Sequence, residues 1–271
     1  MAYNTKDHKY DCRRFEGKVA LLTAATEGIG LATADRLAHE GAKVIISSRN
    51  EVNVKRAVQD LIDSGINPKN IAGTVCHVGN PEHRQNLLDF ATKTFGKIDI
   101  LFNNAGINPA IGTMLEVTPS QYDKMYDVNI KATFLMTKIV AQHMKETGGG
   151  VVIFNGTFGA FRSLRGVRAY NVLKTALVGI TQALAHELGP YNIRINSVHP
   201  GLIQTRMGRI MFDPNHKLHH LVDVKGPTFW AIHRMGQPEE TAAAVCYLAS
   251  DEARHVTGEN HVISGGCDCR L

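Results

Sequence analysis

Short apolar runs alternate along the chain with stretches in which apolar residues recur at helical spacing. The first run, Val19–Leu22, precedes a turn of small residues, and Leu31, Ala34 and Leu37 then repeat at helical spacing up to Gly41. Such a run is typical of a buried strand, and such a repeat of an amphipathic helix. Further strands are predicted near residues 44–46, 73–76, 98–102, 151–154, 194–198 and 261–263. Helices are predicted near residues 51–64, 82–95, 119–145 (whole or broken), 168–188 and 238–249.

This order of elements predicts an α/β fold with a doubly wound, Rossmann-like parallel sheet. Strands that alternate with helices form βαβ units with right-handed crossovers. No internal repeat or linker interrupts the pattern, so we expect a single domain over residues 1–271. The long irregular segment at about 202–236 follows the sixth strand, at the sheet edge where ligands bind in such folds. We expect it to cover a substrate; the alternative is an insertion that packs for stability alone.

Composition and charge exclude several classes of protein. The 271 residues carry a net charge of +5 and are 44% apolar. No apolar run reaches the roughly 18 residues that span a bilayer, and the polar start of the chain lacks the apolar stretch of a secretory signal. The charge is too small for the basic footprint of a nucleic-acid-binding protein. We therefore expect neither a membrane span nor a nucleic-acid partner.

Five cysteines are scattered along the chain, at positions 12, 76, 246, 267 and 269. An odd number at irregular spacing does not form a disulfide framework and is typical of a reducing compartment. Cys267 and Cys269 have no second pair of ligands nearby, and His216, His219 and His220 lack cysteines or carboxylates at ligand spacing. Because a structural zinc site needs four ligands, we predict no metal site.

The turn after the first strand has the features of a dinucleotide site. Gly28 and Gly30 allow backbone to approach a pyrophosphate closely, and the following helix supplies free N–H donors. The second strand ends in Ser47-Ser48-Arg49, with no acid to hold a ribose 2′-hydroxyl. A guanidinium pairs with phosphate oxygens through two hydrogen bonds, so the sequence favours NADP(H) over NAD(H). The alternative is that Arg49 is a solvated charge at a helix start.

Tyr170 and Lys174 lie near the start of the predicted helix 168–188. Residues i and i+4 share a helix face, so the phenol and the ammonium point into the same space. The pKa of an isolated tyrosine is about 10, and a nearby cation lowers it. The pair therefore predicts a group that exchanges a proton with a substrate, although this spacing alone is common by chance.

Together these features resemble the short-chain dehydrogenase/reductases, from about residue 17 to residue 266. The matching segments, in the family's order and spacing, are Thr23-Ala-Ala-Thr-Glu-Gly-Ile-Gly30, Asn103-Asn-Ala-Gly106, Asn129, Tyr170 with Lys174, Pro200-Gly201, Thr257-Gly258 and Gly265-Gly266. Within the family, residues 13–19 and 47–50 resemble peroxisomal NADPH-dependent carbonyl reductases and retinol dehydrogenases. The resemblance implies hydride transfer from NADPH that reduces ketones, aldehydes or dicarbonyls to alcohols, or the reverse oxidation, including retinol to retinal.

The resemblance also implies a role for individual residues. Tyr170 would protonate the carbonyl oxygen, and Lys174 would lower the pKa of Tyr170 and bind the nicotinamide ribose. Asn129 would hold a water that links Lys174 to solvent, and Thr157 would polarise the carbonyl oxygen. The cofactor-binding residues would be Thr23, Ala24, Thr26, Gly28, Ile29, Gly30, Ser48, Arg49, Asn50, Asn103, Ala105, Gly106, Tyr170, Lys174, Pro200, Gly201, Ile203 and Thr205. The substrate-binding residues would be Thr157, Phe158, Tyr170 and Met207.

Three positions depart from the family pattern. Ala24 replaces the first cofactor glycine, which is tolerable if its φ is negative. Thr157 replaces the usual serine; it keeps the hydroxyl but stiffens χ1 and crowds the pocket, and Ser163 is a poorer substitute. The acid that often follows the third strand is absent around Cys76-His77. Asn103 and Asn129 also have a structural alternative, which is to satisfy buried backbone groups.

Assembly and substrate class follow from the resemblance and from the irregular segment. The family implies a homotetramer formed through the helices that bear Asn129 and Tyr170, with C-terminal contacts. The apolar residues of segment 202–236 favour a greasy small-molecule carbonyl substrate such as a retinoid, a steroid or an aromatic ketone; they include Met207, Met211, Phe212, Phe229 and Trp230.

Two alternatives to a carbonyl reductase stay open. An acyl-CoA-directed reductase of the same fold needs a basic patch near the pocket, and Arg162, Arg165 and Arg168 keep this hypothesis open. A catalytically weak NADP-binding regulatory protein is the other alternative, motivated by Thr157 in place of serine.

The last three residues, Cys269-Arg270-Leu271, resemble the small–basic–Leu form of the peroxisomal targeting signal. We therefore expect binding to the peroxisomal import receptor and a peroxisomal location, and otherwise a cytoplasmic one.

Overall fold

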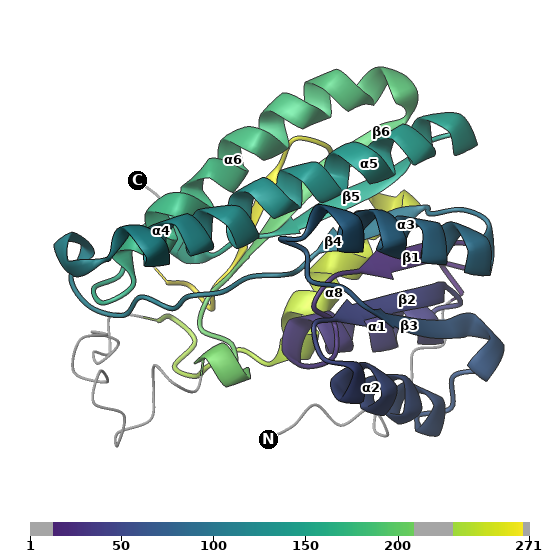
Figure 1. The fold of residues 1–271 in the computed structure, drawn as a ribbon, viewed down its shortest axis with the longest axis horizontal. Helices are drawn as coiled ribbons and strands as arrows, with labels where there is room; N and C mark the ends of the chain where they lie inside the picture. The colour runs from purple at the N-terminus through teal and green to yellow at the C-terminus, as the bar shows by residue number, and fades with distance from the viewer. Residues whose placement is uncertain (1–12, 209–229, 268–271) are drawn as a thin grey trace.

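A parallel sheet of seven strands organises the described residues, which are 13–208 and 230–267 of a computed structural model (Figure 1). The strands are β1 Val19–Leu22, β2 Lys43–Ser48, β3 Ile71–Val75, β4 Ile100–Asn103, β5 Gly150–Asn155, β6 Ile193–Pro200 and β7 Asn260–Ile263. Their order in the sheet is β3-β2-β1-β4-β5-β6-β7, and each neighbouring pair is parallel. The order reverses between β1 and β4, so a crevice opens at the carboxyl ends of these strands, where such sheets bind ligands.

Helices cover both faces of the sheet (Figure 1). One face packs against α1 Gly28–His39, α2 Glu51–Asp63 and α8 Pro238–Ala249, and the other against α3 Pro81–Phe95, α5 Ala132–Thr147 and α6 Arg168–Leu188. Successive residues of β1 alternate between the two cores: Ala20 and Leu22 join the first, and Val19 and Leu21 the second. Because side chains alternate along a strand, only an unbroken apolar run buries both faces. This packing explains the apolar runs in the sequence and confirms the predicted doubly wound fold.

The predicted helix 119–145 is broken in the structure. Thr118 caps α4 Pro119–Tyr126 by a reciprocal pair of hydrogen bonds with Gln121, at 3.3 and 3.0 Å. A π-helix, Asp127–Lys131, then separates α4 from α5. Such wide turns occur mostly as short insertions at functional sites, and this one contains the predicted site residue Asn129.

The segment predicted to cover the substrate is described only at its two ends, 202–208 and 230–236. Met211, Phe212, Phe229 and the histidines at 216, 219 and 220 lie outside the described residues, as do Cys12 and Cys269. Cys76, Cys246 and Cys267 are buried. Within the described ranges no helix is both long and apolar enough to cross a membrane. The same ranges contain no cluster of three histidine, cysteine or acidic side chains suited to a metal ion.

His39, in the last turn of α1, has an acceptor at each ring nitrogen. Nδ1 lies 2.9 Å from the Asp35 carbonyl oxygen and 3.3 Å from its buried carboxylate, and Nε2 lies 3.2 Å from the Ser64 carbonyl oxygen. Only the imidazolium donates at both nitrogens. The bond to the Asp35 side chain, which outweighs burial, raises the pKa of His39 to about 9.

This pKa predicts that the protein loses stability at alkaline pH. A folded-state pKa above the unfolded value of about 6.5 stabilises fully below pH 6.5, and the stabilisation disappears as pH rises through about 9. We expect His39→Gln to remove about 2 kcal/mol of unfolding free energy at pH 6.5 and almost none at pH 10. Urea unfolding at both pH values measures this difference, with exposed His255→Gln as the control. An equal loss at both pH values would contradict the assignment.

Candidate active site

A buried threonine joins the turn after β1 to the end of β4. Thr23 Oγ1 accepts hydrogen bonds from the backbone N–H groups of Asn104 and Ala105, at 3.0 and 3.2 Å. The Asn104 amide donates to the carbonyl oxygens of Thr23 and Ala24, at 3.2 and 2.9 Å. Thr23, predicted to bind the cofactor, therefore shapes the turn, and Asn104 faces it. Asn104 could not be singled out from the sequence, because the strand parity that distinguishes it from Asn103 becomes clear only from the sheet.

Two glycines let α1 begin directly beneath this turn. A Cβ on Gly30 would overlap with the backbone of Ala25 and the side chain of Asn104, at 2.7 and 2.6 Å. Gly28 has φ +58°, and a Cβ there would press against the Thr205 side chain at 3.0 Å. Ile29 packs on the core, and Thr26 is buried. The turn thus presents backbone N–H groups at a helix N-terminus, as a pyrophosphate site requires.

The backbone of Ala24 does not meet the condition under which alanine is tolerated at this place. Negative φ would have made the replacement of glycine free of strain, but the φ of Ala24 is +50°. A left-handed conformation costs an L-residue roughly 1–2 kcal/mol because Cβ approaches the carbonyl oxygen. The family's glycine at this place avoids that strain, and the present chain retains it.

We expect Ala24→Gly to stabilise the protein. Relief of the strain outweighs the greater flexibility of glycine in the unfolded chain, for a net gain of about 1 kcal/mol, or a rise of about 2–4 °C in Tm. Differential scanning calorimetry measures it, with Ala25→Gly as a matched control because Ala25 is fully buried and has no positive φ. The control should lower Tm. A Tm for Ala24→Gly at or below that of the wild type contradicts the strain argument.

The end of β2 presents a free cation. The Ser47 hydroxyl is buried and donates to the Leu22 carbonyl oxygen at 3.2 Å, while Ser48 is half-buried. Arg49 is exposed, and no residue of the described ranges forms a hydrogen bond or ion pair with it. Asn50 caps α2 through its side chain, which accepts from Asn53 N at 3.1 Å. Ser48 and Arg49 are therefore available for a ligand, and the Asn50 oxygen is occupied.

Lys174 is a buried cation with more N–H donors than the described residues offer acceptor atoms. Only 2% of the residue is exposed, and its ammonium donates to the Asn155 carbonyl oxygen at 2.7 Å. No other hydrogen bond to it occurs among the described residues, and burial lowers the pKa of Lys174 to about 8. Gly106 lies against it, because a Cβ there would stand 3.6 Å from the Lys174 nitrogen. Two ammonium hydrogens thus remain for a polar ligand, and the Asn155 side-chain oxygen beside it is also buried without a partner.

Tyr170 lies one helical turn before Lys174 on α6. The Lys174 nitrogen is 5.9 Å from the centre of the Tyr170 ring, which confirms that the two side chains share a face. Burial raises the pKa of Tyr170. The prediction that Lys174 lowers the pKa of Tyr170 is therefore wrong for the protein without a ligand. A protonated phenol is nevertheless the form that donates a proton to a carbonyl oxygen.

Thr157 lies where β5 gives way to a short 3-10 helix, Phe158–Ala160. Its hydroxyl oxygen accepts from Gly159 N at 3.3 Å, so the hydroxyl hydrogen remains free for a carbonyl oxygen. The 3-10 helix packs on α6, since the Thr175 hydroxyl donates to the Ala160 carbonyl oxygen at 3.0 Å. Ser163 lies beyond this helix and is exposed. The structure thus places Thr157 beside the helix that bears Tyr170.

Two predicted site asparagines satisfy buried groups instead. Asn129 Oδ1 accepts from Ile107 N at 2.8 Å, and its amide donates to the Ile107 carbonyl oxygen at 2.9 Å. Asn103 is buried and donates to the Thr137 hydroxyl at 3.0 Å. Both side chains thus form hydrogen bonds within the protein, as the structural alternative for these asparagines requires. The Asn129 amide keeps a second N–H and a second lone pair beyond these two bonds, and Ala105 and Gly106 form the strand exit between the two asparagines.

The start of the covering segment contacts the cofactor turn. After Pro200, Gly201 allows Ser264 to approach, since a Cβ would meet its Cα at 2.7 Å. Ile203 pairs with Gly236, and Thr205 lies over Gly28. Arg206 and Glu27 form an exposed ion pair at 3.3 Å that joins the same two segments.

The two predicted substrate residues outside the catalytic group differ in exposure. Met207 is 42% exposed and available for a ligand. Phe158 is 1% exposed and packs against Leu164, Val167 and Leu202. The Phe158 side chain belongs to a hydrophobic core, so its contact with a substrate stays a prediction that this packing does not favour.

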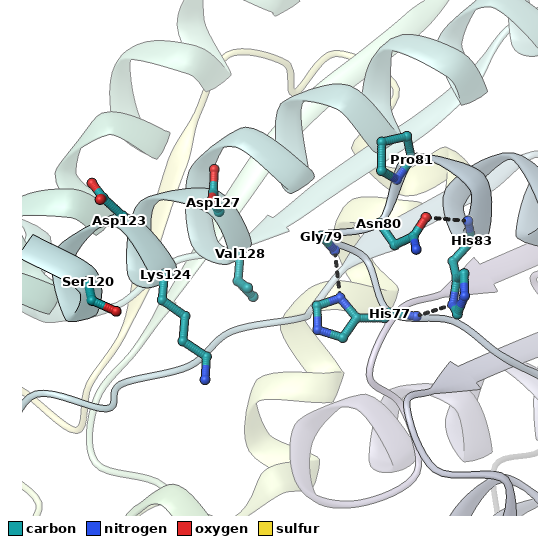
Figure 2. A pocket seen from close by; sticks show the side chains of 10 residues that line it. All are labelled: His77, Gly79, Asn80, Pro81, His83, Ser120, Asp123, Lys124, Asp127 and Val128. Carbon is teal, nitrogen blue, oxygen red and sulfur yellow. Dashed lines mark hydrogen bonds between the residues drawn. The ribbon is translucent and has the colours of Figure 1, made fainter.

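A cavity of about 920 Å³ lies beyond the end of β3, between the start of α3 and the segment formed by α4 and the π-helix (Figure 2). His77 and His83 line one wall, and Lys124 and Asp127 the other. His77 stands near the position of the missing acid, and its backbone N–H donates to the His83 ring at 3.2 Å. None of the predicted site residues lines this cavity, although Val128 precedes Asn129.

Comparison with known proteins assigns the family. A family model described as enoyl-(acyl carrier protein) reductase matches residues 23–268. The chain is 47% identical over 262 residues to dehydrogenase/reductase SDR family member 4 of Caenorhabditis elegans, covering 96% of this chain and 99% of that one. It is 44% identical to the human protein of that name, covering 94% and 88%, and 42% identical to tropinone reductase-like 3 of Erythroxylum coca, covering 96% of each.

Solved structures agree with this assignment. The structure of 7α-hydroxysteroid dehydrogenase complexed with NADH and 7-oxo glycochenodeoxycholic acid is similar at a TM-score of 0.85 and 29% identity, covering 96% of this chain and 98% of that one. That of 3-ketoacyl-(acyl-carrier-protein) reductase from Brucella melitensis complexed with NADH has a TM-score of 0.82 at 29% identity, covering 93% and 98%. With Tyr170, Lys174 and Thr157 gathered at the carboxyl edge of a doubly wound sheet, the chain belongs to the short-chain dehydrogenase/reductase family and is a nicotinamide-dependent oxidoreductase.

Proposed function

We propose that this protein reduces a ketone, aldehyde or dicarbonyl to an alcohol with NADPH. The observation that supports this proposal is the buried Lys174 ammonium, which has one acceptor in the Asn155 carbonyl oxygen and lies one turn from Tyr170. A buried cation with spare donors is unfavourable unless a ligand completes its hydrogen bonds. The two hydroxyls of a nicotinamide ribose match those donors.

The described residues fit the rest of this cofactor. The turn at Gly28 and Gly30 would hold the pyrophosphate at the start of α1, and the exits of β4 and β6 would border the ribose and nicotinamide through Gly106 and Gly201. Arg49, exposed and without an acidic partner in the described ranges, would pair with a 2′-phosphate, and Ser48 would add a hydroxyl.

The protein's own groups would supply the proton and the polarisation. NADPH, when bound, supplies the hydride that goes to the carbonyl carbon. Tyr170 would donate its phenolic proton to the carbonyl oxygen, which becomes the alcohol hydroxyl, and its raised pKa keeps that proton in place beforehand. Thr157 would donate a hydrogen bond to the same oxygen, where negative charge develops. Lys174 would stabilise the phenolate that remains on Tyr170.

The substrate we propose is a bulky apolar carbonyl compound of the retinoid, steroid or aromatic ketone type. The same groups, acting in reverse, would oxidise the corresponding alcohol. Met207 and the half-buried Trp230 are apolar residues of the described ends of the covering segment. A second candidate is an acyl thioester reductase, because Arg162, Arg165 and Arg168 are all exposed in the loop between Thr157 and Tyr170 and at the start of α6. An anionic carrier such as coenzyme A would contact these arginines.

One panel of substrates tests both candidates. The purified protein is mixed with NADPH and, separately, with an aromatic ketone, a dicarbonyl, retinal, a keto-steroid and a 3-ketoacyl-CoA, and NADPH oxidation is followed at 340 nm. Turnover of the uncharged carbonyls supports the carbonyl reductase, and turnover of the thioester alone supports the second candidate. Tight binding of NADPH with no turnover of any substrate would point instead to a regulatory protein.

We expect Arg49→Asp to reverse the cofactor preference. The substitution removes a charge-assisted pair and places a carboxylate near the 2′-phosphate, so we expect the Kd for NADPH to rise about 100-fold and that for NADH to change less than about threefold. Fluorescence titration with both cofactors measures these constants. Arg254→Asp, an exposed charge reversal near the amino end of β7, is the matched control. Equal effects on NADPH and NADH would contradict a role for Arg49 at a 2′-phosphate.

We also propose that the protein assembles as a homotetramer through α5 and α6. Large apolar side chains are exposed on and next to these helices, namely Tyr126, Phe134 and Val172 at 45%, 39% and 45%. Contact with a second copy would cover them. Import into peroxisomes through Cys269-Arg270-Leu271 stays a prediction, because these residues lie outside the described ones.

A further inference from the structure

A second buried side chain fixes the end of β5, and no role was predicted for it. His199, which directly precedes Pro200 at the end of β6, is fully buried. Its Nδ1 lies 3.1 Å from the Thr157 carbonyl oxygen. Its Nε2 lies 2.7 Å from the Ser197 hydroxyl and 3.1 Å from Asn260 Oδ1. The ring therefore joins the catalytic segment to both β6 and β7.

The surroundings of this ring leave it one arrangement. A Cβ on Gly156 would overlap with the His199 ring, so only glycine at this position lets the ring lie against the strand end. The Phe161 ring meets it edge-on, with ring centres 4.8 Å apart and planes at 67°. The Ser197 hydroxyl also lies 2.6 Å from Asn260 Oδ1, so this network fixes the side of the ring that faces away from Thr157.

The hydrogen-bond pattern assigns the tautomer of His199. Burial, and to a lesser extent the Lys174 charge, lowers the pKa of His199, so the ring is neutral at pH 7. A neutral imidazole has one N–H, and the acceptor opposite Nδ1 is a carbonyl oxygen, which cannot donate. Opposite Nε2, the Ser197 hydroxyl can donate or accept, and the Asn260 side chain presents either its oxygen or, when the amide is turned over, its NH2 group. With the hydrogen on Nδ1, the ring donates to Thr157 and accepts from Ser197, and the turned Asn260 amide completes the network.

Two carbonyl oxygens thus hold the segment that bears the Thr157 hydroxyl. The Asn155 carbonyl oxygen accepts from Lys174, and the Thr157 carbonyl oxygen accepts from His199. Gly156 N donates to the Val198 carbonyl oxygen at 2.7 Å between them. Thr157 has extended backbone with φ −159° and ψ 146°, where χ1 of a β-branched residue is restricted, so the backbone position decides where its hydroxyl points.

We propose that His199 is a positioning residue: its Nδ1–H fixes the Thr157 backbone so that the Thr157 hydroxyl faces the reacting carbonyl oxygen. This inference rests on the proposed function, because it assigns a task to Thr157 in that reaction. A displaced catalytic group can lower the rate about 100-fold without any loss of cofactor contacts. His199 itself touches neither substrate nor cofactor.

A double-mutant cycle with Thr157 tests the proposal. His199→Leu keeps an apolar side chain without the donor, and we expect kcat to fall about 10- to 100-fold while the Kd for NADPH stays within about twofold. In a Thr157→Val background, which lacks the hydroxyl, His199→Leu should lower kcat further by less than about threefold. His199→Asn places an amide N–H near the position of Nδ1 and should recover most of the rate. Equal fold losses in both backgrounds would overturn the proposal.

A measurement without turnover separates this inference from the proposed function. Gly159 N donates to Thr157 Oγ1, so amide hydrogen exchange in residues 156–161 reports on this segment. We expect faster exchange there in His199→Leu, recovery in His199→Asn, and unchanged exchange in β1. This pattern in a protein that turns over no carbonyl would refute the proposed reaction and retain the positioning role. Unchanged exchange in His199→Leu would refute the positioning role, whatever the activity.

Discussion

Tyr170→Phe is expected to lower kcat by about 10³-fold, because a positioned general acid contributes roughly 10²–10⁴ to a rate. The substitution keeps the ring and removes only the proton donor. No hydrogen bond to the Tyr170 hydroxyl occurs among the described residues, so Tm should stay within about 2 °C of the wild type. The Kd for NADPH should change less than about threefold, since the remaining groups of the turn and Lys174 are intact.

Steady-state kinetics on the best substrate of the panel, with calorimetry and NADPH titration beside it, measures these three quantities. Tyr247→Phe is the matched control, because Tyr247 is 40% exposed on α8, away from the carboxyl edge of the sheet. A Tyr170→Phe enzyme with kcat within a few-fold of the wild type would show that another group delivers the proton.

Lys174→Met is expected to lower kcat/KM at pH 7 by about 10²- to 10³-fold, the usual effect of removing one preorganised electrostatic contact. Methionine matches the length of lysine but lacks its donors and charge. Stability should change little, because loss of the bond to Asn155 is offset by removal of a buried charge. The effect should therefore appear in cofactor binding and in the rate, and not in folding.

The pKa of Lys174 gives this prediction a second signature. With a pKa of about 8, the ammonium loses its proton as pH rises above 8. Because kcat/KM reports the ionisations of the free enzyme, wild-type kcat/KM for NADPH should fall about tenfold per pH unit above pH 8. The Lys174→Met profile should be flat there. Retention of the alkaline fall in Lys174→Met would assign that ionisation to another group.

The arrangement of elements was predictable because strand and helix periods are local properties of the sequence. Ala20 and Leu22 bury one face of β1 and Val19 and Leu21 the other, so an apolar run sufficed to locate the strand. The helix break at Asp127–Lys131 could not be located from the sequence, because a π-helix places one extra residue in a turn and changes the apolar pattern little.

The site was predictable as a set of motifs but not in its atomic roles. The sequence left the sign of φ at Ala24 open, and the turn that Asn104 holds places it at +50°. The pKa of Tyr170 was expected to fall, yet burial, a tertiary property, raises it. Phe158 follows Thr157 directly, but the 3-10 helix turns its side chain into the core.

Three side chains of the site could not be predicted from the sequence, and the reason is the same for each. Asn104, Asn155 and His199 lie at or just beyond the ends of strands, where the parity of the last residues decides which side chain faces the site. Their partners are far away in sequence, such as Thr23 for Asn104 and Thr157 for His199. A pattern read along one chain gives no information on such pairs.

The support of the site on strand ends has a consequence for how this enzyme diversifies. The Lys174 ammonium, the Thr157 backbone and the turn after β1 are held by the exits of β1, β4, β5 and β6, which belong to one sheet. Substitution of side chains away from these strand ends is thus free to change which compounds are accepted, generation after generation, while the positions of the residues proposed to act in the reaction are inherited unaltered.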